Sequence, residues 1–165
     1  MKSDQITQVL VFLFKSKMLR EGWGEALNLE ELTARVMPGL ADAGFDMERV
    51  EDAFAWLESL VLYQQAMPAG PRKHAMRILS AEEARYLDTT CQCLIQQLYF
   101  DGLLDEVSRE LVIHQLLAFK NEHIDLSLVK LVTLLVLATR DPQALVAASA
   151  RFMEMGGHAV QGRLQ

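Results

Sequence analysis

Helix-start signals recur along this chain, and they constrain its fold more than any other feature of the sequence. Such a signal is a short polar residue, able to cap a helix, in front of apolar residues at helical spacing. Ser80 has Glu83 three residues later, which is the spacing of a capping box. Asp105 precedes another apolar stripe, and Asp141 is followed by Pro142 at the first helical position. The sequence therefore predicts a mainly α fold.

Three helices are expected in the first half of the chain. They cover residues 5–18, 28–44 and 46–63, with N-caps at Asp4, Asn28 and Asp46. Pro38 has no backbone N–H, so we expect the second helix to kink or restart there. Gly44 is expected to end the second helix in the left-handed conformation.

A short β-hairpin, or wing, is predicted after the third helix. Residues 64–79 contain Pro68, Gly70 and Pro71, which are too many breakers for a helix. Short extended pieces are expected on either side of them, at residues 64–66 and 76–79. The order of three helices and a hairpin is that of a helix-turn-helix or winged-helix-like N-terminal part.

The second half is predicted to hold three to four helices. We expect one long helix over residues 80–99, then helices that start at Asp105, Asp125 and Asp141. The last helix is expected to end at Gly156-Gly157 and to leave a frayed tail at residues 158–165. The domain organisation predicted from this is an N-terminal helical subdomain over residues 1–79 and a C-terminal one over residues 80–157, which share one core.

An internal duplication is one interpretation of this order. When Phe45-Asp46 is set over Ile124-Asp125, the apolar positions of the two following helices coincide. The arrangement of two helices and a third with this capped start would then occur twice. The alternative is that any two amphipathic helices align this well.

The sequence gives no sign of catalytic machinery. It lacks a glycine-rich phosphate loop, and its four histidines are scattered without metal-ligand spacing. Cys91 and Cys93 are two apart in a helical pattern, so their side chains diverge. The carboxylate pairs fall in first turns of helices or on exposed faces. We therefore expect no enzyme activity, no cofactor and no metal.

The location expected from the sequence is the cytoplasm. The first residues lack the layout of a signal peptide, because Asp4 interrupts the basic start and Lys15 follows the short apolar run. The longest apolar stretch, residues 126–138, contains Lys130 and is too short to span a bilayer.

Several short runs, in this order along the chain, resemble the bacterial Smg family. They are the runs at residues 40–45, 55–60, 76–78, 102–104, 109–113 and 124–126. The resemblance implies a bacterial cytoplasmic protein of uncharacterised activity, with no established catalytic residues to transfer. Genes of this family tend to lie near those for DNA processing and topoisomerase, which is an association and not a mechanism.

Charge argues against a third helix that reads the DNA major groove. Residues 21–71 contain ten acidic and two basic residues, a balance of −8, against −6 for the whole chain. Such a surface repels phosphates, which protein–DNA contacts neutralise with Lys and Arg. The wing itself is basic, so a winged-helix-like nucleic-acid-binding protein that uses Arg72, Lys73 and Arg77 stays as the alternative function.

The function we expect instead is that of a helical adaptor whose acidic third helix docks a basic protein. The exposed side of this helix is predicted to carry five acidic residues, here called the acidic set: Asp46, Glu48, Glu51, Asp52 and Glu58. Charged surfaces of this kind steer and select oppositely charged partners, among which proteins that act on nucleic acid are one class. Four residues would serve as apolar anchors if they are partly exposed: Trp23, Trp56, Tyr63 and Met67. Otherwise Trp56 is a core residue and the acids serve solubility.

Overall fold

The computed structural model describes residues 2–15, 29–66 and 77–163. Within these ranges the chain forms eight helices and no strand, so the mainly α prediction is confirmed. In the same residues, no helix combines the length and the apolar character that crossing a membrane requires.

The N-terminal part contains α1 (Lys2–Lys15), α3 (Leu29–Asp42) and α4 (Met47–Ala66). α1 begins at Lys2, before the cap position predicted at Asp4, while Asn28 falls outside the described residues. Gly44 has φ 81°, as predicted for a left-handed cap, and Phe45 N donates to Leu40 O at 3.2 Å.

A restart of the helix at Pro38 is wrong, because α3 is continuous through that residue, while a kink there stays a prediction. Pro38 and Ala34, four residues earlier, are both exposed, so water can reach the Ala34 carbonyl that Pro38 has no N–H to bond. Val36 and Leu40 are buried on the opposite side of α3 and hold it against the core. Packing on one face therefore tolerates the proline on the other.

The β-hairpin is not present in the described part of the chain. Residues 64–66 form the last turn of α4, and residues 77–80 have no regular secondary structure. Glutamine is a good helix former, so α4 continues through Gln64 and Gln65. The breakers Pro68, Gly70 and Pro71 lie outside the described residues. The described residues therefore do not support the predicted winged-helix arrangement, which requires a β-hairpin.

The C-terminal part holds five helices where three to four were expected. They are α5 (Ala81–Tyr86), α6 (Thr89–Phe100), α7 (Glu106–Leu117), α8 (Leu126–Arg140) and α9 (Pro142–Arg163). The extra helix arises because the long helix predicted over residues 80–99 is interrupted. Leu87 is extended and fully buried, and the Asp88 side chain caps α6 by accepting from Cys91 N at 2.8 Å. At the other end, α9 continues past Gly156-Gly157 to Arg163, so the end predicted for it is also wrong.

The predicted N-caps of this part are confirmed. Ser80 and Glu83 form the complete capping box of α5. The side chains of Asp105 and Asp125 accept from the backbone N–H three residues later. Asp141 Oδ1 accepts from the backbone N–H groups of Gln143 and Ala144, both at 3.1 Å.

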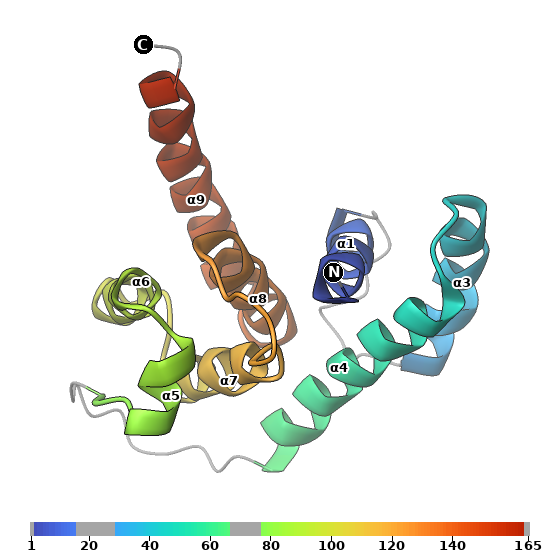
Figure 1. Ribbon diagram of the computed structural model, residues 1–165, viewed down its shortest axis with the longest axis horizontal. Coiled ribbons are helices and arrows are strands. Elements are labelled where there is room, and N and C mark those ends of the chain that lie inside the picture. Colours follow the sequence, from blue (N-terminus) through green and yellow to red (C-terminus); the bar gives the residue numbers. More distant parts are fainter. Residues whose placement is uncertain (1, 16–28, 67–76, 164–165) are drawn as a thin grey trace.

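One hydrophobic core joins the two halves. In Figure 1, α8 lies between α9 and α7, and α4 runs past α7 towards α3. α4 packs on α1, α3 and α7, while α8 packs on α6, α7, α9 and α1. The buried leucines and valines of all these helices form a single cluster, to which α1 and α4 contribute as well as α8. α4 is therefore held along its inner side, and its outer side is left for other contacts.

The two candidate repeats share one packing relation. α4 packs on α1 and α3, the described helices that precede it, and α8 packs on α6 and α7. Phe45 and Ile124 both pack into the core next to an aspartate that starts the following helix. A duplication stays a prediction consistent with this arrangement.

Candidate functional site

All five members of the acidic set are exposed, but the structure divides them by what they contact. Asp46 precedes α4, and its Oδ1 accepts from Glu48 N at 3.2 Å, which stabilises the first turn. Arg49 lies on the same side of the helix as Asp52, with 2.8 Å between Nη1 and Oδ2, and its Nη2 is 3.7 Å from Glu48 Oε2. These three carboxylates therefore have partners within α4.

Glu51 and Glu58 differ from the other three carboxylates. Among the described residues, neither side chain forms a hydrogen bond or an ion pair. They are seven residues apart, so they lie two turns apart on one face of α4. Their negative charge is therefore uncompensated within the described structure and is presented to solvent on one side of the helix.

The same face of α4 carries exposed apolar side chains. Met47 and Leu62 precede and follow the two glutamates at helical spacing, and they are 40% and 58% exposed. Ala55 lies between the glutamates and is exposed as well. This face, defined by Met47, Glu51, Ala55, Glu58 and Leu62, is called the outer face of α4.

A groove of about 620 Å³ runs between the outer face of α4 and α3. Figure 1 shows these two helices side by side at one edge of the molecule. The apolar and small residues that line the groove are Thr33, Ala34, Met37, Val50, Phe54 and Ala55. Its acidic lining consists of Glu51 and Glu58 from α4 and Glu30 from α3. The groove, with its largely apolar lining and three carboxylates, is the candidate site.

The sequence located one wall of this site and missed the other. It predicted the acidic residues of α4, but it gave no sign that Glu30, Ala34 and Met37 of α3 line the same groove. The helical stripe of α3 identifies its buried residues Val36 and Leu40 and leaves the neighbours of its other side open. Only the packing of α3 beside α4 brings the two walls together.

Of the anchors expected from the sequence, Trp23 and Met67 lie outside the described residues, and Trp56 and Tyr63 do not line the groove. Trp56 is a core residue: it is 7% exposed, and its Nε1 donates to Gln115 O at 3.2 Å. Tyr63 is partly exposed, but its ring stacks on His114 of α7 with 3.8 Å between centroids. Both side chains join α4 to α7, on the far side from α3.

The basic residues of the alternative function are only partly described. Arg72 and Lys73 lie outside the described residues. The Arg77 guanidinium donates to both carboxylate oxygens of Glu83, at 2.9 and 2.8 Å, and its Nε donates to Glu110. The hydrogen bonds from Arg77 lower the pKa of Glu83 to about 2, against the opposing effect of burial. Arg77 is thus already neutralised by two carboxylates.

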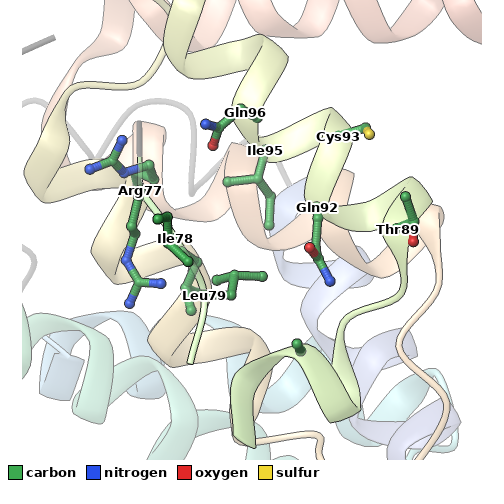
Figure 2. A pocket seen from close by; sticks show the side chains of 11 residues that line it. Arg77, Ile78, Leu79, Thr89, Gln92, Cys93, Ile95 and Gln96 are labelled. Carbon is green, nitrogen blue, oxygen red and sulfur yellow. The ribbon is translucent and has the colours of Figure 1, made fainter. Parts of the chain in front are cut away.

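A second cavity, of about 320 Å³, lies where residues 77–79 cross α6 (Figure 2). Figure 2 shows Ile78 and Leu79 on one side of it and Gln92, Ile95 and Gln96 on the other. The charged residues in its lining are Arg77 and Arg109. Arg109 lies over the Tyr99 ring, 4.2 Å from its centroid, and its Nε is 3.8 Å from Glu110. Because both arginines contact carboxylates, this cavity lacks the uncompensated charge of the groove.

No metal-binding constellation is apparent where the structure is described. In these residues, no three His, Cys, Asp or Glu side chains lie close enough together to hold a metal ion. Cys91 is buried, and burial raises the pKa of its thiol to about 12, whereas Cys93 is exposed beside the second cavity.

Comparison with known proteins identifies the family. A family model described as "Protein of unknown function (DUF494)" matches residues 6–156. A "Protein Smg homolog" of Coxiella burnetii (strain Dugway 5J108-111) is 31% identical over 153 residues, which cover 93% of this chain and 94% of the relative. "Protein Smg" of Salmonella newport is 35% identical over 134 residues, which cover 78% of this chain and 82% of the relative. No solved structure matches the chain. The family resemblance seen in the sequence is thus confirmed, and the chain belongs to the DUF494 family, that of the Smg proteins.

Proposed function

We propose that this protein is a non-catalytic adaptor that docks a basic protein through the groove between α3 and α4. The observation that carries the proposal is the state of Glu51 and Glu58, two exposed carboxylates on one helix face without an ion-pair partner among the described residues. Paired carboxylates such as Asp52 attract a partner less, because Arg49 already offsets their charge. Glu51 and Glu58 are therefore the residues of the acidic set best placed to select a basic partner.

Nucleic-acid binding through the wing has less support. The described residues contain no strand, and Arg77 would have to leave Glu83 and Glu110 to contact a phosphate. That exchange sacrifices charge-assisted hydrogen bonds in a partly buried site. We therefore propose that this protein binds basic side chains of a partner protein and not the phosphates of a nucleic acid.

The test is affinity capture from nuclease-treated bacterial lysate with a charge-reversal variant. Glu51→Lys/Glu58→Lys should lose its partners, because both reversed charges repel a basic surface. Glu82→Lys/Glu154→Lys is the matched control, since both of these glutamates are exposed, lie on other helices and change the net charge equally. The proposal is wrong if both variants retain the same partners as the unmodified protein, or if nuclease alone removes the partners.

A further inference from the structure

We infer that the element docked in the groove between α3 and α4 is a basic amphipathic helix of the partner protein. This inference rests on the proposed function and specifies the shape and chemistry of the docked segment. The proposed function needs only a basic partner, whereas the inference requires apolar contacts in addition to charge.

The length of the outer face fits a helix. Met47 and Leu62 are 15 positions apart in α4, which corresponds to about 22 Å along the helix axis. A docked helix of about four turns covers this distance, with one end over each exposed apolar side chain. The two glutamates then lie beside its middle turns.

The composition of the groove fits the two sides of such a helix. Its lining is apolar at Met37, Phe54 and Ala55, which suits apolar side chains repeated every three or four residues. Glu51 and Glu58 lie on the outer face beside this lining, within reach of Lys or Arg side chains that flank the apolar stripe. Charge selects the partner here, and the apolar contacts hold it.

The secondary structure around the groove favours a helix over an extended segment. Peptides bound as strands need an unpaired sheet edge. The continuously described residues 29–66, which form both walls of the groove, contain no strand. Two parallel or antiparallel helices leave a furrow between their side-chain ridges, and a third helix fills such a furrow. α3 and α4 present a furrow of this kind, and its described lining residues come from these two helices.

A second copy of this chain is a poor occupant of the groove. The chain carries a net charge of −6, so two copies repel one another. The most exposed apolar stripe of α9, at Val146 and Met153, is followed by Glu154 and not by a row of basic residues. The charge of the groove therefore points to a different, basic protein.

The probes are two synthetic peptides of identical composition, about 16 residues of leucine and lysine. In the first, the leucines recur at helical spacing and form one stripe; in the second, the same residues are ordered so that the leucines are spread around the helix. Binding of each fluorescently labelled peptide to the full-length protein is measured by anisotropy. We expect the striped peptide to bind at least about tenfold more tightly than the other.

Two pairs of variants separate the apolar and the charged contributions. Ala34→Gln/Ala55→Gln fills the groove without a change of charge, and Ala147→Gln/Ala150→Gln makes the same change on the exposed side of α9. Glu51→Gln/Glu58→Gln removes the two carboxylates, with Glu82→Gln/Glu154→Gln as its control. All these residues are exposed, and circular dichroism and thermal unfolding establish that each variant is folded.

The expected results assign each contribution separately. The groove-filling variant should lose the preference for the striped peptide, while the α9 variant keeps it, and loss of the two glutamates should weaken both peptides. Equal affinity for the two peptides, or a preference that survives the filled groove, overturns the helix inference and leaves the proposed function standing. Unchanged binding of both peptides after loss of Glu51 and Glu58 overturns the proposed function itself.

Discussion

Arg77 shows how a single side chain fixes a segment that has no regular structure. Its guanidinium bonds Glu83 in the first turn of α5 and Glu110 in α7, so it holds residues 77–80 against both helices. Glu83 in turn completes the capping box with Ser80. The sequence predicted this capping box, because it is local, but the contact with Glu110, 33 residues away, depends on the tertiary fold.

The ion pair between Arg77 and Glu83 makes stability depend on pH in the acid range. The pKa of Glu83 is about 2 in the folded protein, below its ordinary value of 4.5, so the stabilisation is present above pH 4.5 and is lost as the pH falls towards 2. After allowance for screening by water, we expect this contribution to be about 1–2 kcal/mol. Arg77→Met should remove it.

The measurement is urea unfolding followed by circular dichroism at several pH values between 2.5 and 7, a range chosen to cover the titration of paired carboxylates. Arg85→Met is the control, because Arg85 is an exposed arginine of α5, the helix that contains Glu83. The assignment of this ion pair is wrong if Arg77→Met loses stability with falling pH as steeply as the unmodified protein and the Arg85→Met control do.

The two cysteines should differ sharply in reactivity although they are two residues apart. Cys91 is buried with a thiol pKa of about 12, whereas Cys93 is exposed. Thiol reagents react with the thiolate, so the folded protein should take up one equivalent rapidly at pH 8, a value near the ordinary thiol pKa. Mass spectrometry of the Cys93→Ser variant should then show almost no modification until denaturant is added; rapid labelling of that variant would contradict the burial of Cys91.

At the scale of elements, most helix starts were predictable, but the starts of α1 and α6 and several helix continuations were not. Asp105, Asp125 and Asp141 cap their helices as expected, because capping requires only a short polar side chain and the next few residues. The break between α5 and α6 was missed because burial of Leu87 in an extended conformation is a tertiary effect. The predicted hairpin failed for a different reason, because the helix-forming residues Gln64 and Gln65 continue α4 to Ala66.

The groove illustrates the same limit for the candidate site. A helix face can be read from spacing within one helix, and Glu51 and Glu58 were identified in this way. The contribution of α3 depends on which helix packs beside α4, and this information is not contained in either helix alone. The compensation of Glu48 and Asp52 by Arg49 likewise depends on the direction of one long side chain.

The contact between α4 and α7 depends on the indole of Trp56. Its Nε1 donates to the carbonyl of Gln115, and its ring packs 6.0 Å from that of Phe119. Trp56→Phe removes the donor and leaves that buried carbonyl one partner short, so the free energy of unfolding should fall by about 1–3 kcal/mol. Urea unfolding measures this loss, with exposed Phe100→Leu as a control for a change of aromatic content. A loss no larger than that of the control would show that this bond adds nothing to stability.

For the molecule as a whole, one shared core predicts one cooperative unfolding transition. α1 packs on α8, and α4 packs on α7, so neither half buries its apolar surface without the other. Tryptophan fluorescence, to which the core residue Trp56 contributes, and far-ultraviolet circular dichroism should give the same denaturation midpoint. Two separated midpoints would show that residues 1–79 and 80–157 unfold independently.

The separation of α8 from the outer face of α4 has a consequence for how this family evolves. Nine residues of α8 are buried, so substitutions there disturb packing on several sides at once. Ala55, Glu51 and Glu58 lie outside the buried cluster, and replacements at these positions leave that cluster intact. Under the proposed function, descendants of one ancestral protein are thus able to change the partner that they select through a few surface positions while they inherit the same core.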